Sequence, residues 1–99
     1  MNLILLEAMV AVVDYGTFTA AADFLHITQP ALSRRIRALE REVATELFVP
    51  GGRRMILTPA GREMLAPARR ILRDVAQLRA IGGADLALQQ GVSRRPLSD

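Results

Sequence analysis

The sequence contains no cysteine and no tryptophan, and its only histidine is His26. Without cysteine the chain can form neither a disulfide framework nor a thiolate zinc site, and one histidine cannot by itself build a metal site or a nucleophile–base pair. The usual components of hydrolytic and metal chemistry are therefore missing. We predict that the chain is not an enzyme and that it uses no cofactor.

Long apolar runs are also missing. The apolar start of the chain is interrupted by Glu7 and Asp14 and follows no basic segment, so it fits neither a signal peptide nor a membrane span. A length of 99 residues, of which 51% are hydrophobic, is enough for one small domain and a tail. We expect one such domain, located in the cytoplasm.

Lysine is absent as well, because all 13 basic residues are arginines, and 11 of them lie between Arg34 and Arg79. The planar guanidinium group matches phosphate oxygens and the edge of guanine. A GC-rich genome would explain why arginine replaces lysine, but it would not explain the clustering. The central part of the chain therefore points to a nucleic acid as partner.

Three helices are predicted in the first 43 residues. Apolar residues at helical spacing begin at Leu3, and Gly16 ends that helix. Thr17 is placed to cap a short second helix, and Thr28 to cap a third one with a proline in its first turn. The connection between these two helices, His26–Ile27, is so short that the pair predicts a helix-turn-helix.

The third helix has an apolar side and a basic side. The apolar side consists of Leu32, Ile36, Leu39 and Val43. The opposite side consists of Pro30, Ser33, Arg34, Arg37 and Arg41. A solvated amphipathic helix is the alternative interpretation, and it is the commoner origin of a charged stripe. The preceding short turn favours DNA recognition instead.

Two β-prone runs, 47–50 and 53–58, flank the pair Gly51–Gly52. This pattern predicts a β-hairpin with the two glycines as its turn. Arg53 and Arg54 follow at the tip, where a hairpin beside a helix-turn-helix can reach the DNA backbone or minor groove. The hairpin is therefore a predicted wing.

Thr58 and Pro59 mark the start of a long helix over 59–81, before Gly82–Gly83. Apolar residues recur along it with alternating spacings of four and three, as in a coiled coil. Self-association of two chains explains this seam better than packing within one chain. The residues after it, 82–99, are predicted to form a flexible tail. The predicted dimer seam consists of Met64, Ala68, Ile71, Val75 and Leu78.

Five short segments together form a pattern more specific than a helix-turn-helix alone. They are residues 16–22 (Gly-Thr-Phe-Thr-Ala-Ala-Ala), 25–33, 36–40, 47–48 and 57–61. With these segments, the chain from about residue 1 to about residue 80 closely resembles the N-terminal DNA-binding domain of LysR-type transcription regulators. The implied architecture is mainly α, with a winged helix-turn-helix over 1–58 (three helices and a two-stranded wing) and a linker and dimerisation helix over 59–81.

In that family, the third helix enters the major groove, and the linker helix pairs two subunits on an interrupted inverted repeat in double-stranded DNA, where transcription is activated or repressed. By position, Arg53 corresponds to a basic wing residue. The residues that correspond to the groove-facing start of the family's third helix are Thr28, Gln29, Pro30, Ser33 and Arg34.

The residue types support several of these assignments. Gln29 can pair with the donor–acceptor edge of adenine, and Arg34 with the two acceptors of guanine. Thr17 and Thr28, with the backbone amides at their helix N-termini, suit phosphate oxygens. For Gln29 and Ser33 the alternatives are a helix-capping role and simple solvent exposure. The predicted DNA-binding set is Thr17, Thr28, Gln29, Pro30, Ser33, Arg34, Arg53 and, from the helical wheel, Arg37.

The sequence departs from the family pattern at three positions, of which Met9, in place of a typical phenylalanine of the first helix, is a tolerable core substitution. Ala44 stands where the family usually has a glycine at the end of the third helix, and a left-handed cap there would cost about 1 kcal/mol more than with glycine. Pro50 stands where the family usually begins the wing with an arginine, which puts one backbone contact in doubt.

Family members continue into an α/β effector domain that binds a small inducer, and we expect this chain to lack that domain and its inducer site. The leading hypothesis is a sequence-specific DNA-binding dimer. The alternative is an interaction module that forms mixed dimers with full-length relatives through the linker helix. An enzymatic role is disfavoured, because Glu40 and Glu42 lie on different sides of the third helix.

Overall fold

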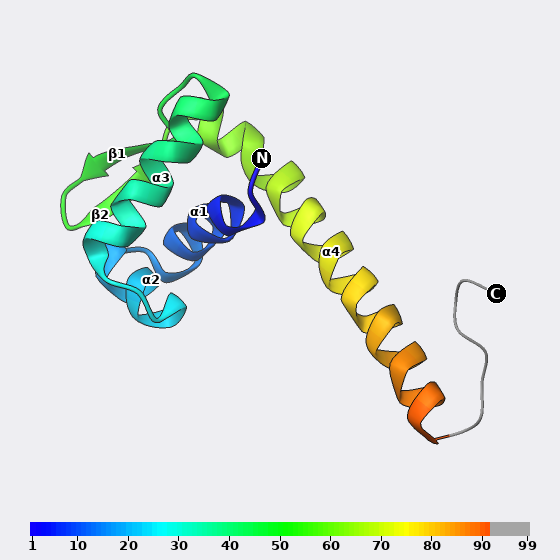
Figure 1. Ribbon diagram of the computed structural model, residues 1–99. Helices are drawn as coiled ribbons and strands as arrows, with labels where there is room; N and C mark the ends of the chain where they lie inside the picture. The colour runs from blue at the N-terminus through cyan, green and yellow to red at the C-terminus, as the bar shows by residue number, and fades with distance from the viewer. Residues whose placement is uncertain (92–99) are drawn as a thin grey trace.

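The computed structural model describes residues 1–91, and the side chains of residues 1–84. A globular part is followed by one long helix that extends away from it (Figure 1). The predicted fold, three helices, a two-stranded wing and a long final helix, is confirmed. The elements in chain order are α1 (Leu3–Tyr15), α2 (Phe18–Leu25), α3 (Gln29–Val43), β1 (Phe48–Gly51), β2 (Arg54–Leu57) and α4 (Pro59–Gly91).

The predicted helix boundaries at Gly16, Thr17 and Thr28 are confirmed. Gly16 takes a left-handed φ of 83° after α1, which glycine adopts without steric cost. The hydroxyl of Thr17 accepts a hydrogen bond from Ala20 N at 3.1 Å, and that of Thr28 from Ala31 N at 3.2 Å. Each hydroxyl thereby satisfies one of the amides that a helix N-terminus leaves unpaired.

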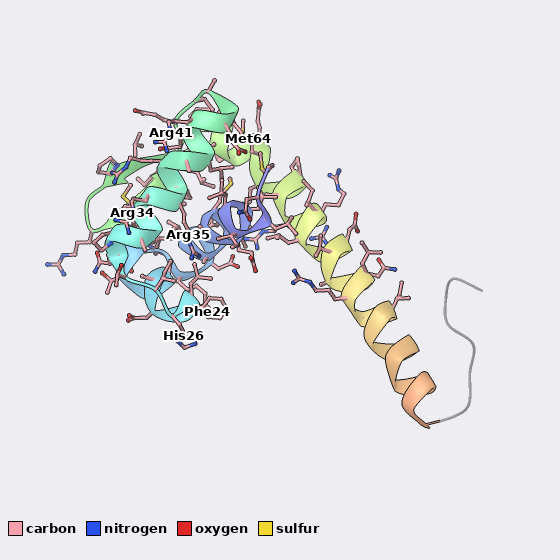
Figure 2. All side chains as sticks on the ribbon, viewed as in Figure 1. Phe24, His26, Arg34, Arg35, Arg41 and Met64 are labelled. Atoms are coloured by element: carbon pink, nitrogen blue, oxygen red, sulfur yellow. The ribbon has the colours of Figure 1, made fainter. Side chains whose placement is uncertain are left out.

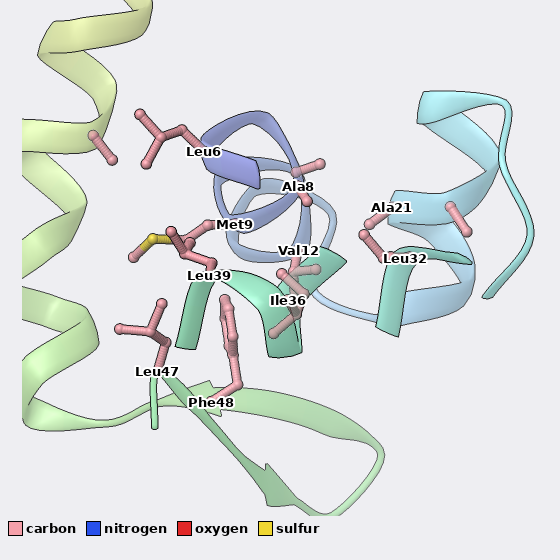
Figure 3. Packing of buried hydrophobic residues seen from close by; sticks show 13 residues of the cluster. Leu6, Ala8, Met9, Val12, Ala21, Leu32, Ile36, Leu39, Leu47 and Phe48 are labelled. Atoms are coloured by element: carbon pink, nitrogen blue, oxygen red, sulfur yellow. The ribbon is translucent and has the colours of Figure 1, made fainter. Parts of the chain in front are cut away.

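The hydrophobic core joins every element of the globular part. The buried side of α3, with Leu32 and Leu39, packs against Met9 of α1 and the small residues of α2. Leu47 and Phe48, at the start of the wing, enter the same core (Figure 3). The predicted apolar stripe of α3 is confirmed as its core-facing side, so the opposite stripe faces solvent.

The wing is an antiparallel pair whose turn lies one residue later than predicted. Gly51 pairs with Arg54, so the two-residue turn is Gly52–Arg53 and not Gly51–Gly52. Gly52 has a φ of 72°, whereas Arg53 is not among the residues with positive φ. A positive φ at the first turn position alone is the pattern of a type II′ hairpin, which requires only one glycine.

Pro50 fits the wing because of its register. It pairs with Met55, next to the pair Gly51–Arg54 that closes the turn. A two-residue turn closes on a hydrogen-bonded pair, and pairs along an antiparallel ladder alternate between bonded and non-bonded. Pro50 therefore occupies a non-bonded position, where the ladder needs no N–H.

The predicted end of the long helix at Ile81 is wrong. The helix α4 passes through Gly82 and Gly83 and continues to Gly91, and neither of the two glycines takes a positive φ. Glycine lowers helix stability by about 1 kcal/mol relative to alanine, but it leaves the helical hydrogen bonds intact. The predicted tail over 82–99 is thus helical as far as 91, and residues 92–99 lie outside the described part. None of the helices in residues 1–91 is both long and apolar enough to cross a membrane.

The start of α4 is fixed to the wing by Thr58 and Gly61. The Thr58 hydroxyl accepts from Gly61 N at 3.0 Å and donates to Glu46 O at 2.7 Å, while Thr58 N donates to Leu47 O at 2.9 Å. Gly61 is buried, and a Cβ there would lie 2.6 Å from the carbonyl oxygen of Leu47. Only glycine permits this approach of helix to backbone.

Because of the contact at Gly61, replacing glycine with alanine should have opposite effects on stability at Gly61 and at Gly83. Gly61→Ala should lower the free energy of unfolding by about 1–3 kcal/mol, because the methyl group overlaps a backbone atom. Gly83→Ala, where nothing lies within 4 Å, should stabilise α4 by up to about 1 kcal/mol. Urea unfolding followed by circular dichroism measures both, and equal effects at the two sites would contradict the proposed contact.

Ala44 ends α3 in the left-handed conformation, with φ 56° and ψ 36°. Ala44→Gly should therefore raise the free energy of unfolding by about 0.5–1 kcal/mol, because glycine adopts this conformation without a Cβ penalty. The control is Ala38→Gly within α3, which should lower stability by about 1 kcal/mol. Destabilisation by both variants in thermal or urea unfolding would argue against a strained cap.

Candidate nucleic-acid interface

The helices α2 and α3 form the predicted helix-turn-helix. The chain reverses at His26, which takes a left-handed φ of 58° that histidine tolerates better than most residues. The Ile27 amide donates to Ala22 O at 3.0 Å and so closes the end of α2. The N-terminus of α3 consequently lies on the surface, beside α2 (Figure 1).

The start of α3 brings most of the predicted DNA-binding residues together. Thr28, Gln29, Pro30, Arg34 and Arg37 are exposed, and Ser33 is half-buried. Figure 2 shows Arg34 and Arg41 along this helix. One surface therefore combines amide donors, guanidinium groups and the carbon face of a proline, which are the groups that contact phosphates and base edges.

The two capping threonines keep a free proton. The hydroxyls of Thr17 and Thr28 accept helix amides, but a hydroxyl that accepts one hydrogen bond can still donate another. Both stand at helix N-termini, where unpaired amides and the helix dipole favour an anion. Their geometry is therefore compatible with phosphate contacts.

Gln29 does not cap its own helix. Its Nε2 donates to the hydroxyl of Thr19 on α2 at 2.9 Å, across ten positions of sequence. Sequence reasoning missed Thr19, because periodicity within one helix does not indicate which residues of two helices face each other. The available signal was that Thr19 and Gln29 are polar and lie near the starts of the two helices of the helix-turn-helix.

Glu40 lies on the same helix as the arginines but serves the fold. Its carboxylate accepts from Leu47 N at 2.7 Å and from Phe48 N at 3.4 Å. These bonds fix the loop after α3 to the first strand of the wing. Among the described side chains of residues 1–84, the Glu40 carboxylate is the only one of α3 that accepts a hydrogen bond, and it pairs with no arginine.

The two arginines predicted at the wing tip have different surroundings. Arg53 stands exposed in the turn itself. The guanidinium of Arg54 instead lies over Gly16, so that a Cβ on that glycine would collide with it. A cation near the C-terminal end of α1 interacts favourably with the helix dipole. Arg54 is thus exposed like Arg53, but it also contacts the end of α1 and so connects the wing to that helix.

The predicted dimer seam divides between two environments. Ala68 is only 3% exposed and belongs to this chain's own core, and Met64 packs against that core. Ile71 and Leu78, by contrast, are 44% and 69% exposed. The N-terminal part of α4 covers the globular part, whereas its C-terminal part extends away from it (Figure 2). The assignment of Ala68 to a dimer surface is thus corrected, since little of it is accessible.

An ion pair fixes the first half of α4 to α1. The guanidinium of Arg69 binds the carboxylate of Asp14 through two hydrogen bonds, of 2.6 and 3.3 Å. The hydrogen bond to Asp14 raises the pKa of Arg69 above its ordinary value. Both side chains are partly exposed, so this contact orients α4 more than it stabilises the fold.

Comparison with known proteins agrees with this architecture. Residues 3–62 match the family described as "Bacterial regulatory helix-turn-helix protein, lysR family". The chain belongs to the LysR family. The resemblance drawn from the sequence motifs is confirmed.

Among its relatives is the "Uncharacterized HTH-type transcriptional regulator in ibpB-leuC intergenic region" of Azotobacter vinelandii, 49% identical over 72 residues, which cover 73% of this chain and 50% of that protein. The "DNA-binding transcriptional dual regulator OxyR" of Escherichia coli K12 is 38% identical over 91 residues, 92% of this chain and 28% of OxyR. This LysR-family chain thus spans half or less of the length of these regulators.

Among solved structures, the "BenM_DBD/benA site 1 DNA Complex" matches with a TM-score of 0.78 and 39% identity, covering 85% of this chain and 98% of the BenM chain. The identity is high enough for the shared fold to reflect common descent. The winged helix-turn-helix and its linker helix in this chain are therefore those of a LysR-family DNA-binding domain.

Proposed function

We propose that this chain binds double-stranded DNA with sequence specificity, as the recognition part of a transcription regulator. The observation that carries the proposal is the exposed start of α3, where Gln29, Ser33 and Arg34 stand beside the capped N-termini of two helices. The BenM domain, which shares the fold at 39% identity, is described as a DNA complex. Such a module acts where the chromosome is, in the cytoplasm.

In this proposal each contact has a chemical reason. Arg34 and Arg37 donate to guanine acceptors or to phosphates, and Gln29 pairs with adenine. Pro30 offers carbon surface to a thymine methyl group. Thr17 and Thr28 donate to phosphates beside the helix N-termini, and Arg53 extends from the wing toward the backbone or minor groove.

We further propose that the chain binds as a dimer to an interrupted inverted repeat. The support is the part of α4 from Ile71 onward, where Ile71 and Leu78 are exposed and Val75 is half-buried, with Leu78 the most exposed of the three. Ile81, which sequence reasoning did not include, is 60% exposed and lies one turn after Leu78, beside this seam. Pairing of two such helices removes this apolar surface from water and sets the spacing of the two recognition helices.

The same exposed surface gives a second candidate function, the formation of mixed dimers with longer relatives. It requires the apolar second half of α4 but not tight DNA binding by this chain. A seam made of apolar residues alone discriminates weakly between partners, since selectivity in paired helices comes largely from polar and charged positions. The two candidates differ in whether the arginines of α3 matter for function.

DNA binding can be measured by fluorescence anisotropy with a duplex selected by this chain from a randomised pool. Arg34→Ala should weaken binding of the selected duplex by about 1–3 kcal/mol and relax the preference at one base pair, whereas Arg53→Ala should weaken all duplexes alike. The control is Arg79→Ala in the exposed half of α4. A plot of the logarithm of the binding constant against the logarithm of the salt concentration should have a slope of about −0.9 for each neutralised phosphate.

Two outcomes would count against DNA recognition. Equal affinity for the selected and a scrambled duplex at moderate salt would exclude sequence specificity. Absence of binding to any duplex would exclude the DNA-binding function and leave the mixed-dimer candidate.

Dimer formation can be tested by sedimentation equilibrium with Leu78→Glu. A carboxylate in an apolar seam must be desolvated without a partner, so the variant should be monomeric and should lose the advantage of a two-half-site duplex over a single half-site. The matched control is Gln77→Glu, which adds the same charge at the neighbouring exposed position. Equal behaviour of the two variants would contradict a seam at Leu78. Co-purification with a full-length LysR-family regulator, with and without Leu78→Glu, tests the mixed dimer.

A further inference from the structure

The hydrogen bond between Thr19 and Gln29 has no part in holding either helix together internally. Thr19 is in the first turn of α2 and Gln29 is the first residue of α3, and both side chains are exposed. The neighbouring hydroxyls of Thr17 and Thr28 accept amides of their own helices, whereas the Thr19 hydroxyl accepts from the Gln29 side chain at 2.9 Å. This contact therefore orients a side chain rather than capping a helix.

The contact leaves intact the two groups that base recognition needs. The carboxamide nitrogen of glutamine carries two protons, and Thr19 engages one of them. When Thr19 takes the proton trans to Oε1, the cis proton and Oε1 stay available side by side, and these are the donor and the acceptor that match N7 and the N6 amino group of adenine. A freely rotating carboxamide presents donor and acceptor in either order. The bond to Thr19 determines which end of the amide faces α2, and so fixes the order.

We propose that Thr19 is a positioning residue for base recognition, because its hydroxyl holds the Gln29 carboxamide in the orientation that pairs with adenine. The inference rests on the proposed DNA-binding function. Orienting the amide before DNA arrives removes part of the conformational entropy that Gln29 would otherwise lose on binding. Thr19 keeps its own O–H, which is free to donate to a nearby phosphate and thereby links the position of the DNA backbone to the orientation of the amide.

The hydrogen bond itself can be tested without DNA. Relaxation of the Gln29 side-chain ¹⁵N signal should show an ordered amide in the native chain and in Thr19→Ser, and a mobile one in Thr19→Val. The control is Thr45→Val, the same change just after the C-terminal end of α3, which should leave Gln29 unaltered. An equally ordered Gln29 amide in Thr19→Val would overturn the inference, whatever the DNA-binding result.

The effect on recognition can be tested with the selected duplex and with duplexes changed at single base pairs. Gln29→Ala should abolish the preference at one base pair of each half-site. Thr19→Val should reduce the preference at that same pair by about 3- to 10-fold, and Thr19→Ser should restore it. In a Gln29→Ala background, Thr19→Val should change the preference no further. Thermal unfolding of each variant verifies that these substitutions at exposed positions leave the fold intact.

Several results would overturn the inference. A uniform loss of affinity on all duplexes in Thr19→Val, with the base preference unchanged, would assign Thr19 to phosphate binding or to structure alone. If Thr19→Val reduces the base preference equally in the native and the Gln29→Ala backgrounds, the two residues act independently. If Gln29→Ala leaves every preference unchanged while the native chain still prefers its selected duplex, the proposed function survives and this inference fails. If the native chain shows no preference at all, the proposed function fails first, and the role in recognition falls with it.

Discussion

The packing of the apolar side of α3 against α1 is the constraint on which the rest of the structure depends. Leu32, Ile36 and Leu39 are almost completely buried, against Met9 and Val12 of α1. Because a helix has only two broad sides, burying one side fixes the other in solvent. The exposure of Arg34 and Arg37 is thus a consequence of the core, and it requires no contact of their own.

Two polar anchors extend this constraint to the wing and to α4. The Glu40 carboxylate holds the amides of Leu47 and Phe48, which places the first strand at the end of α3. Thr58 and the close approach at Gly61 then fix the start of α4 against the same segment. A displaced core would therefore shift the wing arginine and the linker helix together with the recognition helix.

The helix α4 has a divided role because of where the globular part ends. Its first half contributes Ala68 to the core and binds α1 through the pair Arg69–Asp14. Beyond Leu72, which still packs against the core, its apolar residues lie outside the globule. One continuous helix, Pro59–Gly91, thereby connects the proposed DNA-binding surface to the proposed dimer surface.

The sequence alone determined the boundaries of the first helices and the buried side of α3. Caps at Gly16, Thr17 and Thr28 and the apolar stripe of α3 are local patterns, and local patterns fix helix ends and faces. For the same reason the sequence indicated which residues begin the recognition helix, and the family motifs agreed with it.

The tertiary structure decided what depends on distant residues. The wing turn shifted to Gly52–Arg53, because the register of two strands follows their pairing and not glycine content. The helix α4 continued past Gly82–Gly83, because two glycines weaken a helix without ending it. Ala68 is buried in the core, and Thr19 accepts a hydrogen bond from Gln29. Both contacts join different elements, so they depend on where the helices cross in space. A pattern within one segment carries no such information, and so the sequence determined the faces of the helices, and only the folded chain determined what each face meets.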